Sequence, residues 1–275
     1  MKQLLRNFAF TTGLLLTVLL VVGALAAPLL APHDPIAQDT SRRLEAPSHE
    51  HPLGLDDLGR DVLSRILYGA RVSLRVGFSV VLLASTVGVT LGAISGYFGG
   101  LIDVLVMRLC DILLAFPGIL LAIALVAVLG PSLNNVVLAL SIIGWVGYAR
   151  LVRGQVLKVR EMEYVTAARA MGAKSPRVIL RHVLPNVINP VIVMATLGLA
   201  GAILAEASLS FLGLGVQPPT PSWGEMLSAG RRYLGLANHL AIFPGAAIML
   251  AVMGLNFLGD GLIDALDPKY RKLMR

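Results

Sequence analysis

The stretch ILLAFPGILLAIALVAVLGPSLNNVVLALSIIGWVGYA (residues 112–149) contains no charged residue and is far longer than one membrane crossing requires. A helix needs about 20 apolar residues to span roughly 30 Å of hydrocarbon. Residues 130–135, GPSLNN, interrupt the stretch with residue types that favour turns. The stretch therefore predicts two membrane helices, at 112–130 and 136–152, joined by a short loop.

Four further uncharged runs are long enough to cross a bilayer. The first is longer than the apolar part of a signal peptide, which is roughly 7–15 residues, so we expect it to be retained as a helix. Because backbone N–H and C=O groups in lipid must be paired within the segment, all of these runs should be helical. Together with the two helices above they predict six spans. The four runs cover residues 7–32, 76–102, 182–205 and 233–259, with spans expected at 10–30, 76–96, 187–206 and 241–259.

The composition also favours a protein whose solvent is membrane lipid. Hydrophobic residues make up 56% of the 275-residue chain and charged residues only 14%, whereas soluble domains carry about 25% charged residues. The net charge of +7 does not predict nucleic-acid binding, because the basic residues lie in loops without interleaved aromatic residues. Since Cys110 is the single cysteine, an internal disulfide and a cysteine metal site are both excluded. We predict an all-α integral membrane protein.

The basic residues set the orientation and the division of the chain. With the N-terminus inside, 15 of the 23 Lys and Arg residues fall on the cytoplasmic side, so both termini are expected in the cytoplasm. We expect a first helix with an outer loop (1–70), a five-helix domain (71–265) and a cytoplasmic tail (266–275). The 15 residues are Lys2, Arg6, Arg108, Arg150, Arg153, Lys158, Arg160, Arg169, Lys174, Arg177, Arg181, Lys269, Arg271, Lys272 and Arg275.

The largest cytoplasmic loop has the pattern of two short helices that meet at an angle. Residues 164–171 are rich in helix-favouring alanine, and Gly172 is placed to end that helix in a left-handed conformation. Ser175 is expected to cap a second helix with Pro176 at its first position. Pro185 should end that helix before the fifth span. The result is a basic elbow that protrudes into the cytoplasm; the alternative is an unstructured, solvated loop.

This loop resembles the "EAA" loop of ABC importer permeases, whose pattern is Glu-Ala-Ala, three residues, Gly, nine residues, Ile, one residue, Leu-Pro. Thr166 stands where the family has Glu and His182 where it has Ile, so a salt bridge from that Glu is not expected here. In the family the loop docks into a cleft on a separate ATPase subunit. The residues that fall on the pattern, and are therefore predicted to form the ATPase-coupling loop within 161–186, are Thr166, Ala167, Ala168, Gly172, His182, Leu184 and Pro185.

Three further stretches resemble the dipeptide, oligopeptide and nickel branch of these permeases (DppC/OppC-like). The resemblance implies a type I importer fold in the bacterial cytoplasmic (inner) membrane and a heterodimer with a second permease subunit. It also implies two ATP-binding cassette subunits, which bind ATP and Mg, and an extracytoplasmic substrate-binding protein. The imported solute is expected to be a di- or oligopeptide, with nickel or another small solute as the alternative. The three stretches are residues 51–65, residues 206–215 with 221–224, and residues 256–268.

No catalytic constellation is present in the sequence. It has no GxxxxGK[ST] phosphate loop, so a non-catalytic subunit without a cofactor is expected. A stand-alone channel or secondary transporter is the alternative of another class, disfavoured by the elbow loop and by the lack of internal repeats. A membrane enzyme is disfavoured because no nucleophile–base pair or metal cluster falls within the spans.

Several charged or polar residues outside the loop invite specific predictions. Glu206, at the outer end of the fifth span, is expected either to hold the following segment as a structural cap or to form a negative wall of the translocation pathway. The three residues 49–51, His-Glu-His, could ligate a metal ion, but a solvated mixed-charge loop is the more common arrangement and no metal site is predicted. Arg108 and Asp111 are expected to form an ion pair.

The remaining predictions concern local backbone structure. The charged residues between 56 and 65 should form local pairs and caps on a short interfacial helix that leads to the second span. The alternative is that they form a docking surface for the binding protein. Pro117, Pro190 and Pro244 lie in or near spans, where proline kinks a helix.

Overall fold

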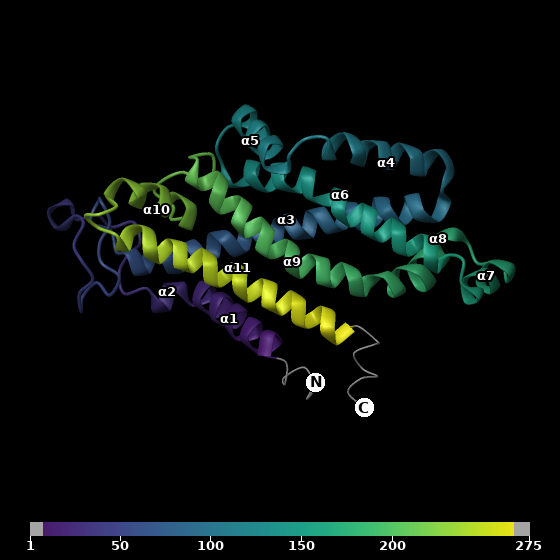
Figure 1. Ribbon diagram of the computed structural model, residues 1–275, viewed down its shortest axis with the longest axis horizontal. Helices are drawn as coiled ribbons and strands as arrows, with labels where there is room; N and C mark the ends of the chain where they lie inside the picture. Colours follow the sequence, from purple (N-terminus) through teal and green to yellow (C-terminus); the bar gives the residue numbers. More distant parts are fainter. Residues whose placement is uncertain (1–7, 267–275) are drawn as a thin grey trace.

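The computed structural model describes residues 8–266, and this part of the chain is a bundle of helices without a strand (Figure 1). Five helices are long and apolar enough to cross a membrane, and the number rises to six if the bent pair of α4 and α5 is counted as one span. The elements are α1 (Phe8–Leu25), α2 (Ala27–Leu30), η2 (Thr40–Arg42), α3 (Val62–Phe98), α4 (Gly100–Leu114), α5 (Gly118–Leu129), α6 (Leu133–Val159), α7 (Glu163–Ala170), α8 (Ser175–Val178), η3 (Ile179–Val183), α9 (Leu184–Phe211), α10 (Trp223–Gly230), η4 (Arg231–Tyr233) and α11 (His239–Leu266).

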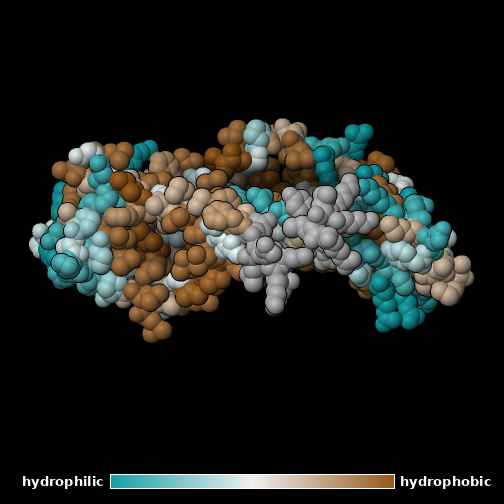
Figure 2. All heavy atoms as spheres, turned by 60° about the horizontal axis from the view of Figure 1, so that its bottom comes forward, coloured by the Kyte–Doolittle hydropathy of each residue, from teal (hydrophilic) through white to brown (hydrophobic). Residues whose placement is uncertain are grey.

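The long helices lie side by side and alternate in direction. Helix α7 lies at one end of the bundle, and α10 lies toward the other (Figure 1). The start of α1 and the end of α11 point toward the end that carries α7. The excess of basic residues on the α7 side assigns that end to the cytoplasm. On the part of the face in Figure 2 that is not drawn in grey, apolar surface lies between hydrophilic surface at the left and right ends, as expected for a protein that crosses a bilayer.

The third predicted span is wrong as a single straight helix. The structure has α4 and α5 instead, separated by a break at 115–117 and bent by 85°. Pro117 explains the break, because its ring disfavours helical backbone at Phe116 and its nitrogen cannot donate a hydrogen bond. Pro117 instead precedes α5, and its carbonyl accepts hydrogen bonds from the first turn of that helix. Pro190 and Pro244 lie inside α9 and α11 without ending them.

The predicted turn between the third and fourth spans is confirmed. Helix α5 ends at Leu129 and α6 starts at Leu133. Ser132 caps α6 by accepting a hydrogen bond from the Asn135 amide N–H. The side-chain amide of Asn135 donates to the carbonyls of Leu129 and Gly130, both at 2.9 Å. Both ends of the turn are therefore satisfied by its own polar side chains.

The short interfacial helix predicted before the second span is not a separate helix. Asp61 caps a helix as predicted, but that helix is α3, which runs for 37 residues without a break. The predicted domain boundary between residues 70 and 71 therefore lies inside α3. The predicted tail, 266–275, lies outside the described residues except for Leu266, the last residue of α11.

Glycine brings α3 into close contact with α6. Gly88, Gly92 and Gly96 recur every four residues, so they lie on one face of α3. A Cβ atom on Gly88 would lie 2.5 Å from the carbonyl oxygen of Trp145, and one on Gly92 only 2.4 Å from that of Ala149. The two backbones approach each other closely because these positions carry no side chain, as in other membrane helix pairs.

We predict that Gly92→Ala destabilises the bundle, because the added methyl group meets a backbone oxygen that cannot move alone. Overpacking of this kind costs about 1–3 kcal/mol, so the melting temperature of the purified protein should fall by several degrees. The control is Gly154→Ala on α6, where no atom lies within 4 Å of the new Cβ. Equal melting temperatures for the two variants would show that the α3–α6 contact adapts to a side chain.

Candidate coupling and translocation sites

The predicted elbow is present at the cytoplasmic end of the bundle, with α7 as its outermost helix (Figure 1). Helix α7 ends as predicted at Gly172, which has a φ of +84°. The Gly172 N–H donates to the Arg169 carbonyl at 2.9 Å, and the Ala173 N–H donates to the Ala168 carbonyl at 3.1 Å. This is the hydrogen-bond pattern of a Schellman C-cap, in which a left-handed residue turns the chain sharply out of a helix.

The second half of the elbow differs from the prediction at both ends. Lys174, not Ser175, is the residue that precedes α8, and it makes no side-chain cap. Pro185 does not end the helix: Ser175–Phe211 is one continuous span. A π-turn at Ile179–Val183 explains why, because the Leu184 N–H donates to the Ile179 carbonyl, five residues back. This extra residue in the turn accommodates Pro185, which has no N–H to donate.

The predicted coupling residues divide between a packed face and an exposed face. Ala168 is buried, and its neighbour Val165 lies with Val178 in the hydrophobic core at the cytoplasmic end. His182 and Leu184 are half-buried. The exposed residues of the pattern are Thr166, Ala167, Gly172 and Pro185, and large apolar side chains beside them are also exposed, namely Tyr164, Met171 and Leu180.

Two arginines hold the elbow against the end of α3. The guanidinium of Arg169 lies 4.8 Å from the centre of the Tyr97 ring, and Arg160 donates a hydrogen bond of 2.8 Å to the Gly96 carbonyl. The elbow therefore has a fixed inner side and an outer side that combines apolar and basic groups. Such a surface is chemically suited to bind another protein.

A cavity of about 570 Å³ lies among α3, α5, α6 and α9. Its walls are apolar and rich in small residues, and Tyr148 is the largest side chain among the residues that line it. The Tyr148 hydroxyl donates to the Met194 carbonyl at 3.4 Å. These lining residues were not predicted from the sequence, because glycine and alanine in a span carry no chemical signature. The small-residue run Gly198–Ala202 of α9 was the available signal.

Glu206 is fully buried near the outer end of α9 and is not among the residues that line this cavity. Its carboxylate accepts hydrogen bonds from the hydroxyls of Ser210, at 2.6 Å, and Ser73 of α3, at 3.2 Å. This geometry fits the structural role, because the carboxylate joins α3 to the last turns of α9. A role of Glu206 in the translocation pathway stays a prediction.

Comparison with known proteins identifies the family. Residues 88–272 match the family described as binding-protein-dependent transport system inner membrane component. Residues 1–47 match the N-terminal transmembrane domain of oligopeptide transport permease C. The first match covers more than half of the chain. This chain is a permease of that family.

Curated relatives align with the permease over almost its full length. The dipeptide transport system permease protein DppC of Alkalihalophilus pseudofirmus is 50% identical over 98% of this chain and 89% of its own length. The glutathione transport system permease protein GsiD of Pectobacterium atrosepticum is 46% identical over 98% of this chain and 90% of its own. GsiD of Escherichia coli O157:H7 is 45% identical over 98% and 89%. The resemblance to ABC importer permeases of the DppC/OppC class is thus confirmed.

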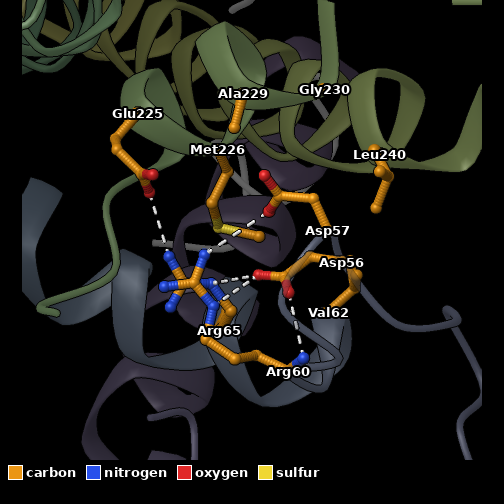
Figure 3. A pocket seen from close by; sticks show the side chains of 10 residues that line it. All are labelled: Asp56, Asp57, Arg60, Val62, Arg65, Glu225, Met226, Ala229, Gly230 and Leu240. Carbon is orange, nitrogen blue, oxygen red and sulfur yellow. Dashed lines mark hydrogen bonds and ion pairs between the residues drawn. The ribbon is translucent and has the colours of Figure 1, made fainter. Parts of the chain in front are cut away.

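At the outer end of the permease, a buried arginine joins the start of α3 to α10 (Figure 3). Arg65 is 1% exposed, and its Nη2 lies 2.9 Å from Oε2 of Glu225. Asp56 lies 3.5 Å from the Nε of Arg65 and forms a 2.6 Å ion pair with Arg60. The local pairs predicted between 56 and 65 are confirmed, but the Arg65–Glu225 pair, 160 residues apart, was not predicted. No local pattern indicates such a partner.

The ion pair predicted between Arg108 and Asp111 is present but weak. The two side chains are exposed and lie 3.9 Å apart, whereas Asp111 makes a closer ion pair with Arg150 of α6. Exposed pairs contribute little, roughly 0–1 kcal/mol. The pair with Arg150 links α4 to α6, which gives it the larger structural role.

The prediction for residues 49–51 also needs correction. His49 is exposed as expected for a solvated loop, but His51 is 6% exposed, with its Nδ1 3.0 Å from Oδ1 of Asp61. Glu50 is exposed and accepts a hydrogen bond from Arg42 at 3.1 Å. This hydrogen bond lowers the pKa of Glu50, so its carboxylate is ionised at neutral pH.

We predict that Glu206→Gln lowers uptake of acidic, neutral and cationic solutes to the same extent. A glutamine offers one acceptor oxygen and an NH2 group in place of two carboxylate oxygens, so one of the two serine hydroxyls must turn to accept instead of donate. We expect this rearrangement to cost about 1 kcal/mol of stability. The melting temperature of the assembled transporter should fall accordingly. Normal stability with a loss confined to cationic solutes would contradict the structural role and would place the carboxylate on the translocation pathway.

Proposed function

We propose that this permease forms one half of the translocation pathway of an ATP-driven importer of di- and oligopeptides. A second permease subunit supplies the other half as a heterodimer. Two ATP-binding cassette subunits bind ATP and Mg at the cytoplasmic end, and an extracytoplasmic binding protein delivers the solute. The names of the relatives, a dipeptide permease and glutathione permeases, support a peptide as the solute.

The continuity of the elbow with α9 is the observation that carries this proposal. Ser175–Phe211 begins in the elbow and ends near the outer face, and at about 1.5 Å per residue it spans roughly 55 Å. Met194, Gly198 and Ala202 of this span line the cavity. A force applied to the elbow by an ATPase subunit therefore acts on the same continuous helical span that forms a wall of the cavity. ATP hydrolysis in the partner can thus change access to the solute.

The chemistry of the cavity favours a peptide over nickel. Among the residues that line the cavity there is no histidine, cysteine or carboxylate. A nickel ion that has lost its water needs such ligands, because imidazole, thiolate and carboxylate groups are what bind it in proteins. A small peptide needs volume and apolar surface, and both are present in this half of the pathway.

We predict that Gly172→Val uncouples transport from ATP hydrolysis. No atom lies within 4 Å of a new Cβ at this position, so the effect comes from the backbone and not from a clash. A left-handed conformation costs a residue with a side chain about 1–2 kcal/mol, which lowers the equilibrium constant between the correct elbow and its alternatives roughly 5- to 30-fold. Uptake should fall by a similar factor, measured in proteoliposomes with the partner subunits.

The matched control is Gly172→Asn, because asparagine tolerates the left-handed conformation better than other residues with a side chain. Uptake should follow the order glycine, asparagine, valine, with equal amounts of each variant in the membrane. If the valine variant assembles with its ATPase subunits and transports at the parental rate, the elbow does not couple the two activities.

A further inference from the structure

Two segments of the outer face bring three potential metal ligands together. His33 follows α2, Glu50 and His51 lie in the next loop, and one ligand atom of each lies within 4.8 Å of the other two. His49, the remaining histidine of the loop, is not part of this group. Residues 49–51 are adjacent in the sequence and were considered together as possible ligands. In the fold, His33 and not His49 lies beside Glu50 and His51.

His51 has the arrangement of a metal ligand that is held in place by a carboxylate. Its Nδ1 lies 3.0 Å from Oδ1 of Asp61, which leaves Nε2 without that partner and 3.8 Å from Oε1 of Glu50. Histidines that bind metals usually donate their other ring N–H to a carboxylate, which fixes the tautomer and the ring orientation. Asp61 itself is fixed, because its second oxygen accepts from the Ser64 N–H and caps α3.

The side chain of His33 has a ring nitrogen that is available to bind a metal ion. Its Nδ1 is buried and has no hydrogen-bond partner. The Asp61 carboxylate is 3.8 Å away, too far for a hydrogen bond, and the His33 and His51 rings lie 4.4 Å apart between centroids. A buried nitrogen without a partner costs free energy. The backbone of His33 is nevertheless held at this place, because its N–H donates to the Ser64 hydroxyl at 3.2 Å.

The spacing of the three ligand atoms fits a metal ion after a small movement. With bonds of about 2.0–2.1 Å, two ligands of a tetrahedral ion lie about 3.3 Å apart. The present separations are at most 4.8 Å, so they must shorten by up to about 1.5 Å. The exposed side chain of Glu50 can turn away from Arg42 to allow this movement. Two imidazoles and one carboxylate suit zinc, nickel or copper and not magnesium or calcium.

We propose that His33, Glu50 and His51 bind a first-row divalent transition-metal ion, with Zn²⁺ as the reference ion, at the outer face of the permease. Asp61 orients His51 from the second coordination sphere, and a water molecule completes the site. The ion links the segment after α2 to the outer loop, and Asp61 connects this site to the start of α3. It is a resident ion and not the transported solute, because the site lies on the outer loop, away from the cavity among α3, α5, α6 and α9.

Zinc binding to the purified, tag-free transporter in nanodiscs tests the proposal. After treatment with a chelator, the wild-type complex should bind one more Zn²⁺ per copy than the His33→Gln complex, measured by titration calorimetry and metal analysis. His33→Gln and Glu50→Gln should each weaken this site at least about tenfold, the lower limit seen when even second-sphere residues are lost. Co²⁺ should give the visible absorption of a tetrahedral ion in the wild type and not in His33→Gln.

His49→Gln is the matched control, since it removes a histidine from the same loop outside the group and should leave zinc binding unchanged. Zinc should raise the melting temperature of the wild type and of this control, but not that of the other two variants. Because the His33 Nδ1 makes no hydrogen bond, His33→Gln without metal should melt like the wild type. Zinc binding that is absent from the wild type, or equal in His33→Gln, would overturn the proposal.

Discussion

The contact between α3 and α6 is the interaction on which the rest of the permease depends. Because Gly88, Gly92 and Gly96 allow the two backbones to touch, the longest helix of the bundle becomes a fixed support for the others. Its outer start carries Arg65 and the Asp61 cap, and its inner end is held to the elbow through Gly96. The outer loop and the cytoplasmic elbow are therefore both attached to α3, although they lie at opposite ends of the molecule.

Against this fixed axis, α9 is the element best placed to move. It packs on α3 and α6, lines the cavity with small residues, and continues into the elbow through the π-turn. A π-turn is a local weak point in a helix and is often found at functional sites. The glycines and alanines of α9 allow sliding without large steric barriers, whereas the buried Glu206 anchors its outer end to Ser73. Movement of the elbow is therefore expected to tilt α9 about this anchor.

The sequence was sufficient for features that depend on local chemistry and insufficient for those that depend on distant partners. Lengths of apolar runs predicted the spans, and Gly172 was correctly expected at a left-handed turn. Pro117 indicated a kink, but not an 85° break, because the angle depends on what α5 packs against. Pro185 was taken as a helix end, since a π-turn has no sequence signature. The Arg65–Glu225 pair and the meeting of His33 with His51 required the fold itself.

The central claim is that the outer side of α7 contacts an ATPase subunit, and site-specific cross-linking tests it most directly. A photo-reactive residue in place of Ala167, which is exposed on α7, should cross-link to an ATPase subunit in the assembled transporter. The same residue in place of Phe78, which is 65% exposed in the apolar part of α3, should not. Cross-links from position 167 only to lipid, to the other permease or to the extracytoplasmic binding protein would contradict the coupling role and the orientation of the bundle.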